Sequence, residues 1–290
     1  MVLAAMRGVV DDLLTTVFPG ECRLCELPLV RAGVLPVCEV CVGRVLPQSG
    51  LLCGVCGEAL GMESERFAEG FGGEARVCTP CRRVRPGFAR AVAYGVYEGE
   101  LREMIHLLKY ERVTALARPL GRMLARAVGE LGGELETGEV LVTAVPLFGA
   151  KERGRGFNHA ELLASAAMRE LRRVRPEMKL RAAHGVMRRV RETESQFGLT
   201  PHARRKNVRG AFAVVDAARV AGRDVLVIDD IYTTGATARA CAAELLRAGA
   251  RRVLVATLAR AQVERVALWD AASGEARIEG QAAMWTGGLR

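Results

Sequence analysis

Two adjacent carboxylates stand directly after a short apolar run in this chain of 290 residues. The run is Val225–Ile228, and the carboxylates are Asp229 and Asp230. A hydroxyl-rich turn then opens an alanine-rich helical segment with Thr233, Thr234, Gly235, Ala236 and Thr237. Unpaired N–H groups at a helix N-terminus bind phosphate, and a glycine lets the backbone approach a ligand closely. The carboxylates would repel a phosphate, but they accept hydrogen bonds from neutral hydroxyls. The spacing therefore predicts a site for a phosphorylated sugar.

The whole string Val225–Thr237 resembles the 5-phosphoribosyl-1-pyrophosphate (PRPP) signature of type I phosphoribosyltransferases. The resemblance implies that Asp229 and Asp230 are catalytic residues that hold the ribose hydroxyls. It also implies that Thr233 to Thr237 bind the 5′-phosphate and that Mg²⁺ binds together with PRPP. The structural alternative is a buried strand that ends in an acidic helix cap. Paired acids followed by Thr-Thr-Gly-Ala-Thr disfavour that alternative.

Three cations follow a second apolar run, Val140–Val145. They are Lys151, Arg153 and Arg155, and they lie among glycines in the stretch AKERGRGFN. Arginine offers phosphate a bidentate contact, and the glycines let the cations approach two phosphates closely. In the resembled fold a pyrophosphate-binding loop stands at this point in the chain order. We predict that these three residues bind pyrophosphate, with an exposed basic turn as the alternative.

A further polar and basic segment, Gln196–Phe212, lacks the periodicity of a core element. In the resembled enzymes a mobile hood covers bound PRPP and keeps water from the reacting ribose carbon. The residues that we assign to such a hood are Gln196, Arg204, Arg205 and Lys206. The three cations among them are equally suited to contact nucleic acid, and the sequence does not separate the two interpretations.

Eight of the nine cysteines form four C-x-x-C pairs in the N-terminal third of the chain. The pairs are Cys22/Cys25, Cys38/Cys41, Cys53/Cys56 and Cys78/Cys81. Because two thiolates with a two-residue spacer reach one zinc ion, the pairs predict one or two structural four-cysteine sites. We favour sequential pairing, and a crossed arrangement stays open. A cytosolic setting disfavours disulfides, and four copies disfavour a redox-active motif. The ninth cysteine, Cys241, is expected in the core.

Strands and helices alternate along the rest of the chain. Strand character marks Ala89–Tyr97, read as a bent strand or a strand pair, and Val140–Val145, Val225–Ile228 and Arg252–Leu258. Helical spacing marks Leu101–Leu108, Ala115–Leu131, Asn158–Val174 and Ala236–Ala248. Asn158 is the expected N-cap of the third helix, with Glu161 three residues on. This order predicts an α/β fold whose parallel sheet is flanked by helices and binds ligands at the carboxyl ends of its strands.

Composition divides the chain into three parts. Residues 1–86 hold the cysteine pairs and few long apolar runs, which predicts an N-terminal helix and a zinc-binding module that needs its cross-links. Residues 87–260 carry the alternating elements. Residues 261–290 are weakly patterned, and an extra strand, a helix or a disordered end all fit this C-terminal tail.

The net charge of +9 is concentrated in one region. Residues 150–210 hold 16 Lys/Arg and 6 Glu, or +10, which leaves −1 for the rest of the chain. A localised positive field indicates an anionic partner such as phosphate, pyrophosphate or nucleic acid, although a solvated basic helix at Arg169–Arg175 explains part of it. No apolar run reaches membrane-spanning length, and charges interrupt Met1–Phe18, so we expect a cytoplasmic protein without a secretory signal.

The cysteine pairs, the PRPP-like string and the stretches RGRGFNHAELLA and QFGLTPHARRKNVRGAF together resemble the ComF (ComFC) family. The resemblance covers roughly Pro19–Arg260. It implies a type I phosphoribosyltransferase-like fold with a small N-terminal zinc module of the four-cysteine kind. Members of that family are associated with competence for DNA transformation, so the resemblance also implies a link to DNA uptake.

One departure bears on the reaction. Purine-salvage phosphoribosyltransferases carry an acid three positions after the second acid, where this chain has Thr233, and a hydroxyl does not replace a carboxylate as general base at neutral pH. The histidines, His106, His159, His184 and His202, read as surface or packing residues. One predicted function is transfer of phosphoribose from Mg·PRPP to an unidentified nitrogen acceptor. The alternative is a non-catalytic PRPP sensor that binds single-stranded DNA, which the scarcity of aromatic residues in the basic region disfavours.

Overall fold

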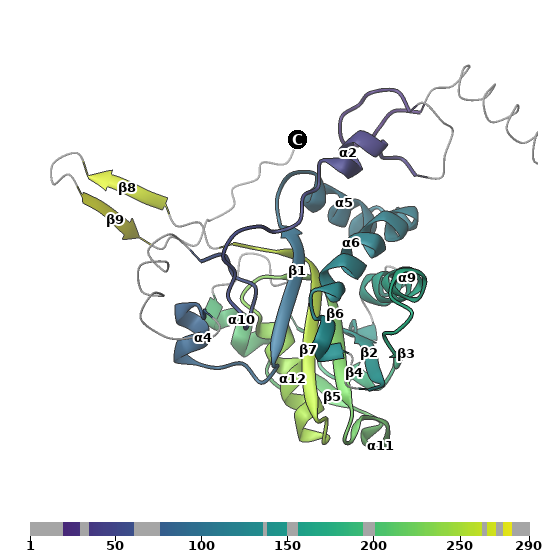
Figure 1. Cartoon of the computed structure of the whole chain (residues 1–290), viewed down its shortest axis with the longest axis vertical. Helices are drawn as coiled ribbons and strands as arrows, with labels where there is room; N and C mark the ends of the chain where they lie inside the picture. Colours follow the sequence, from purple (N-terminus) through teal and green to yellow (C-terminus); the bar gives the residue numbers. More distant parts are fainter. Residues whose placement is uncertain are drawn as a thin grey trace, which may run out of the picture.

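The computed structural model describes residues 20–29, 35–60, 76–135, 138–149, 156–193, 201–262, 266–270 and 275–279. Its centre is a five-stranded parallel sheet with the strand order β1-β7-β6-β2-β3 (Figure 1). The strands are β1 Arg90–Val96, β2 Val140–Ala144, β3 Leu180–Ala182, β6 Asp224–Tyr232 and β7 Arg252–Arg260. Two antiparallel pairs stand apart from it: β4 Met187–Arg189 with β5 Phe212–Val214, and β8 Val266–Asp270 with β9 Glu275–Glu279.

Helices cover both faces of the sheet. The longer ones are α5 Gly99–Tyr110, α6 Ala117–Gly129, α9 His159–Val174 and α12 Ala236–Arg247. The shorter ones are α2 Glu39–Gly43, α4 Thr79–Arg83, η1 Thr114–Leu116, α7 Gly132–Leu135, α10 Pro201–Val208 and α11 Ala217–Val220. Because α6 and α9 pack on one face and α12 on the other, the predicted α/β fold is confirmed. No helix in the described ranges is both long and apolar enough to cross a membrane.

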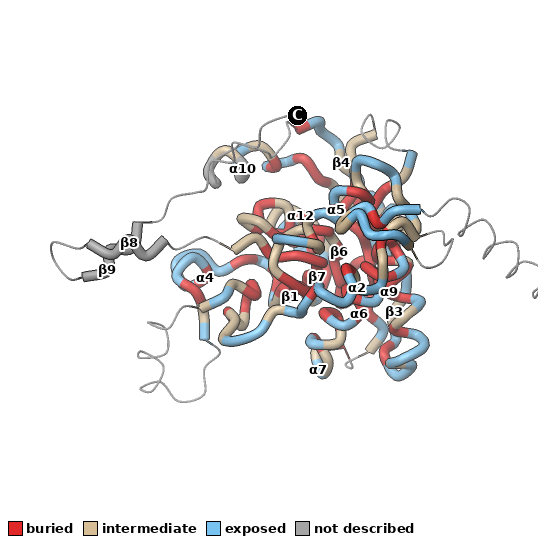
Figure 2. Tube along the Cα trace, turned by 90° about the horizontal axis from the view of Figure 1, so that it is seen from above, coloured by how far each residue is buried: buried red, intermediate tan, exposed pale blue. Residues whose placement is uncertain are grey.

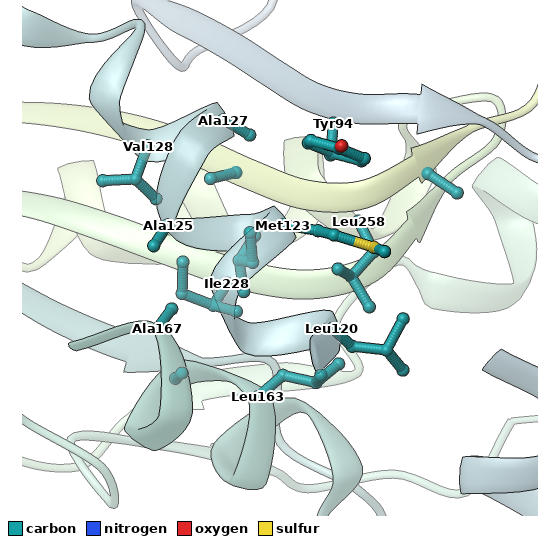
Figure 3. Close-up of a cluster of buried hydrophobic side chains, with 14 of the residues drawn as sticks. Tyr94, Leu120, Met123, Ala125, Ala127, Val128, Leu163, Ala167, Ile228 and Leu258 are labelled. Carbon is teal, nitrogen blue, oxygen red and sulfur yellow. The ribbon is translucent and has the colours of Figure 1, made fainter. Parts of the chain in front are cut away.

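The central strands are apolar because both of their faces are covered. In β6, Leu226 and Ile228 belong to the core beneath α6 and α9, whereas Val225 and Val227 belong to the core beneath α12. This alternation follows from the two-residue period of a strand. Figure 3 shows the first core, where Ile228 lies among side chains of α6 and α9. In Figure 2 the interior of the sheet is accordingly buried.

Helices α6 and α9 approach each other closely at Gly121. A Cβ added there would lie 2.4 Å from the Cβ of Ala166 and 3.0 Å from its carbonyl carbon. Real Cβ atoms essentially never lie closer than 3.0 Å to such neighbours, so only glycine lets the two helices meet at this distance. Helices α6 and α9 together form one closely packed layer on this face of the sheet.

Ala89–Tyr97 contains one strand, β1, and not a strand pair, and Glu98 is the N-cap of α5. Two other elements differ from the sequence predictions in their bounds. Strand β6 does not end at Ile228 but runs to Tyr232, because β7 keeps pairing with it as far as Arg260 while β2 ends opposite Ile228. The predicted helix Ala115–Leu131 is divided into η1 and α6. In the C-terminal tail the structure describes the hairpin of β8 and β9.

The chain order creates a switch point between β2 and β6. These strands are neighbours, yet the helix that follows β2, α9, lies on one face and the helix that follows β6, α12, lies on the other. The chain therefore leaves the two strands toward opposite faces at the carboxyl edge of the sheet, which is where ligands of doubly wound sheets bind.

The N-terminal segment covers the free edge of β1. The Gln48 N–H donates to the Tyr94 carbonyl at 2.6 Å, and the Ala91 N–H donates to the Val55 carbonyl at 2.8 Å. These bonds satisfy edge groups that would otherwise be available to another chain. Figure 1 shows α2 near α5, and α4 on the other side of β1.

Candidate functional site

The two predicted acids lie on the part of β6 that extends beyond β2. The backbone N–H of Asp230 donates to Asp229 Oδ1 at 2.9 Å, and the backbone N–H of Ile231 donates to Asp230 Oδ1 at 2.8 Å. Each carboxylate is thus held by the main chain that follows it. Since β2 has already ended opposite Ile228, the two acids lie at the carboxyl edge of the sheet, beyond the last residue of β2 that pairs with β6.

Two cationic or basic groups that the sequence did not assign to the site converge on Asp230. The Lys109 ammonium, from the last turn of α5, contacts Asp230 Oδ2, and His159 Nε2, from the first residue of α9, lies 3.2 Å from the same oxygen. His159 is buried, but it is more than a packing residue, because it pairs with an acid of the site. A histidine next to the N-cap of the helix after β2 stands where ligands bind in this fold, and that position was the available signal. Nothing local in the sequence marked Lys109.

Asp229 is half-buried, and its environment opposes ionisation. Burial raises the pKa of its carboxyl group to about 6, although Lys109 and Arg189 act against that shift. Arg189 comes from β4, so the antiparallel pair β4–β5 contributes a positive charge toward the acid. At neutral pH Asp229 is therefore an ionised acceptor in a partly desolvated place, where hydrogen bonds to it are strong.

The acid pair fits sugar hydroxyls better than a resident metal ion. His159, Asp229 and Asp230 offer three ligand atoms within 4.8 Å of one another. However, the Lys109 ammonium already compensates Asp230, and Mg²⁺ prefers oxygen ligands and keeps several of its waters. Any magnesium at this edge would thus be held mainly by the substrate and by water.

The turn after β6 keeps the predicted geometry. Gly235 has a φ of 72°, in the left-handed region, and is the N-cap of α12, and among the described residues no side chain caps that helix. The hydroxyl of Thr234 is buried and, within the same residues, has no hydrogen-bond partner. Helix α12 thus begins without a side-chain cap from the described residues, and the buried Thr234 hydroxyl stands just before it and a few residues after the acids.

Several predicted site residues cannot be placed. Lys151, Arg153, Arg155 and Gln196 lie outside the described residues, and of Arg204 and Arg205 only the backbone of α10 is described, whereas Lys206 is exposed on that helix.

The base of the predicted pyrophosphate loop is described. Asn158 caps α9 as predicted, accepting from the Ala160 N–H at 3.0 Å, and its Nδ2 donates to the Val145 carbonyl at 3.2 Å. Asn158 therefore joins the two ends of this loop at the carboxyl end of β2.

The eight paired cysteines form two four-sulfur clusters. The first module holds Cys22, Cys25, Cys38 and Cys41, and the second module holds Cys53, Cys56, Cys78 and Cys81. Sequential pairing is therefore confirmed, and Cys241 is buried in the core as expected.

Sulfur separations in both modules suit zinc. Cys22 and Cys41 are 3.9 Å apart, Cys25 and Cys38 3.8 Å, and Cys56 and Cys78 3.6 Å. A disulfide bond is about 2.05 Å long, whereas tetrahedral zinc with Zn–S bonds of about 2.3 Å places its sulfurs about 3.8 Å apart. All nine cysteines are free, and the clusters have the dimensions of closed zinc sites with four thiolate ligands.

Over most of its length the chain is similar to proteins named for DNA utilization or for competence. No protein-family model matches the chain. DNA utilization protein YhgH of Escherichia coli strain CFT073 is 32% identical over 245 residues, which cover 83% of this chain and 97% of that protein. The protein of the same name from Salmonella typhi is 31% identical with the same coverage. Competence protein F of Haemophilus influenzae is 28% identical over 249 residues, covering 84% of this chain and 98% of that protein. A solved structure, TT1426 from Thermus thermophilus, is 20% identical and covers 52% of this chain and 84% of its own, with a TM-score of 0.27 that is too low to support a conclusion.

Proposed function

This chain belongs to the ComF family, and from that premise we propose that it binds Mg·PRPP at the carboxyl edge of its sheet in the service of DNA utilization. One observation carries the PRPP part of the proposal. The acids end β6 at the switch point, and the uncapped N-terminus of α12 follows them within a few residues, which suits the joint binding of a phosphate and neighbouring hydroxyls.

Each part of PRPP has a group suited to it. Asp229 and Asp230 accept hydrogen bonds from the ribose 2′- and 3′-hydroxyls. The turn Thr233–Thr237 receives the 5′-phosphate. The cations that receive the pyrophosphate are Lys151, Arg153 and Arg155. Lys109 compensates the charge of Asp230 and His159 lies against the same carboxylate oxygen, which makes both of them positioning residues of the acid pair.

The proposed reaction is transfer of phosphoribose to a nitrogen acceptor. A bond forms between the nitrogen and ribose C1 while the C1–O bond to pyrophosphate breaks. Pyrophosphate leaves with the bonding electrons, and the proton of the acceptor nitrogen passes to water or to the departing pyrophosphate. Magnesium supplies charge neutralisation on that leaving group. No carboxylate stands at position 233, so the acceptor is not expected to need a base there, and purine salvage is disfavoured.

The link to DNA rests on the relatives. Two of them are named DNA utilization protein and one is named Competence protein F. We propose that this chain, like them, works with DNA-uptake machinery in natural transformation. The two modules, with zinc bound, are structural sites, since four cysteines leave no open coordination position.

Calorimetric titration with Mg·PRPP tests the ligand. We expect saturable binding to the wild type and an affinity about tenfold weaker or lower still for Asp229→Asn, because hydrogen bonds to charged groups contribute about 1.5–3 kcal/mol. Glu139→Gln is the matched control, since Glu139 contacts Arg181 and Arg223 near the amino ends of the strands. Absence of heat from the wild type would remove the proposal. Pyrophosphate release across a panel of nitrogen bases then separates an enzyme from a sensor.

A second function, binding of single-stranded DNA, is favoured by exposed cations around β4, β5 and α10. These are Arg188, Arg191, Lys206 and Arg209. Phe212 is buried, so in the described part of this surface phosphate contacts would dominate over base stacking.

Salt titrations test this second function. We expect affinity for an oligonucleotide to fall steeply with salt, and the slope to decrease by about 1 for each lost phosphate contact in Arg204→Ala/Arg205→Ala/Lys206→Ala. Salt-insensitive binding would contradict it.

A further inference from the structure

The two cysteine modules are built on one hydrogen-bond plan. In both, the N–H of the first cysteine donates to a carbonyl five residues on, and the N–H of the third cysteine donates to the first sulfur at 3.3 Å. In both, the third cysteine is also the N-cap of a short helix. The residue two positions after the second cysteine differs, however: it is the exposed Leu27 in the first module and Glu58 in the second. The second module thus carries an acid that the shared plan does not require.

The partner of Glu58 is Arg260. It ends β7, is 4% exposed, and its Nη2 contacts Glu58 and donates to Cys56 Sγ at 3.7 Å. Its Nη1 donates to the Thr233 carbonyl at 3.0 Å. One buried guanidinium therefore joins a cysteine of the second module to the first residue of the proposed phosphate turn.

A second contact path runs from the same arginine through an aromatic ring. The guanidinium carbon of Arg260 lies 4.1 Å from the centroid of the Tyr232 ring, which in turn packs against Gly235. A Cβ added to Gly235 would lie 2.1 Å from the Tyr232 hydroxyl oxygen, so the ring touches the glycine backbone directly. Arg260 thus contacts Thr233 directly and Gly235 through the Tyr232 ring.

Buried cations require compensation, and here the module contributes to it. Glu58 supplies one negative charge, while a zinc-loaded site of four cysteines has a formal charge of about −2, because four thiolates surround a divalent ion. Groups that donate to metal-bound sulfurs are set in place by the metal site. Loss or oxidation of the site removes this partner and leaves a guanidinium that is costly to bury.

We propose that Arg260 is a positioning residue through which the metal state of the second module sets the anion affinity of the turn Thr233–Gly235. The inference rests on the proposed phosphate binding at that turn. Loading the second module holds the turn in its binding geometry, and release or oxidation of its metal weakens binding. Since coupling between sites is reciprocal, an anion at the turn also retains metal in the second module.

Metal release tests the reciprocal effect with ribose 5-phosphate as the probe. Zinc transfer from the full-length protein to a colorimetric chelator is followed with and without the probe. Cys25→Ser and Cys56→Ser, which occupy equivalent positions in the two modules, assign the two release phases. We expect the probe to slow release from the second module about fivefold or more, in line with typical coupling between sites, and to leave the first unchanged.

Variants of the arginine separate positioning from a general structural role. Arg260→Met should abolish the effect of the probe, and Arg260→Lys should restore only part of it, because an ammonium lacks the planar fork that spans Cys56 and Thr233. Glu58→Gln serves if Arg260→Met does not fold. Equal slowing of both modules, or unchanged slowing in Arg260→Met, overturns the inference.

A ligand-free measurement distinguishes failure of this inference from failure of the proposed function. Exchange of zinc for cadmium in the second module should shift the amide resonances of Thr233, Thr234 and Gly235 in the wild type and not in Arg260→Met. Resonances that stay in place overturn the coupling even if ribose 5-phosphate binds. Shifts without any binding of ribose 5-phosphate support the coupling and remove the proposed ligand.

Discussion

The two carboxylates of the candidate site, Asp229 and Asp230, differ in their surroundings. The side chain of Asp230 is 7% exposed, and its carboxylate contacts the Lys109 ammonium and lies 3.2 Å from His159 Nε2. The carboxyl group of Asp229 is desolvated, and burial raises its pKa to about 6 although Lys109 and Arg189 act against the shift. A carboxylate that is held ionised in a desolvated place costs stability and gains strength as a hydrogen-bond acceptor.

Replacement of Asp229 by asparagine should therefore stabilise the fold while it weakens ligand binding. The folded pKa of about 6 exceeds the ordinary value of 3.8, so the wild type loses stability as pH rises from about 4 to about 6, and the loss stays constant above that. We expect Asp229→Asn to exceed the wild type in unfolding free energy by about 1–3 kcal/mol at pH 7.5 and to match it near pH 4. Denaturant titrations across this pH range provide the measurement. A variant that is less stable at every pH would show that the Asp229 carboxylate makes a stabilising contact that an amide cannot replace.

At the scale of the secondary-structure elements, the close contact between α6 and α9 sets the position of α9, whose first residue, His159, lies against Asp230. Gly121 would be read locally as a weak point of a helix, since glycine costs about 1 kcal/mol relative to alanine there. Its neighbours Ala166 and Ala167 leave no room for a Cβ. The packing of the two helices overrides the local preference.

Gly121→Ala should accordingly destabilise the protein in spite of its better helix propensity. Because the clash involves the backbone of α9, we expect a loss of about 1–3 kcal/mol, typical of overpacking. Gly129→Ala is the control in the same helix, since an added Cβ there meets nothing closer than 3.9 Å and should leave stability unchanged or slightly increased. Thermal unfolding of both variants is the measurement. A Gly121→Ala protein as stable as the wild type would mean that the helices can separate without cost.

At the scale of the whole molecule, the two modules join the N-terminal segment to opposite faces of the sheet. Cysteines of the first module belong to the core beneath α6 and α9, and those of the second belong to the core beneath α12. Metal in the modules would hence stabilise both cores, because closed zinc sites with four cysteine ligands contribute folding free energy.

Metal analysis should find two zinc ions per chain in the wild type and one in each of Cys25→Ser and Cys56→Ser. Both variants should unfold at lower temperature than the wild type, since each loses one structural site. Elemental analysis of protein purified without added metal, followed by calorimetry, makes the comparison. One zinc in the wild type would mean that only one of the two clusters is a metal site.

Local features of the sequence determined the positions of β1, β2, β6 and β7, most boundaries of the longer helices, the Asn158 cap and the chemistry of the cysteine pairs, because periodicity, capping and ligand type are short-range properties. Tertiary structure alone decided which cysteine pairs share a cluster, that β6 outruns β2, and that Lys109 and His159 meet Asp230. It also brought Arg260 to Cys56, which is 204 residues away along the chain. The strand order sets such contacts, and no pattern confined to one segment encodes the order in which segments assemble.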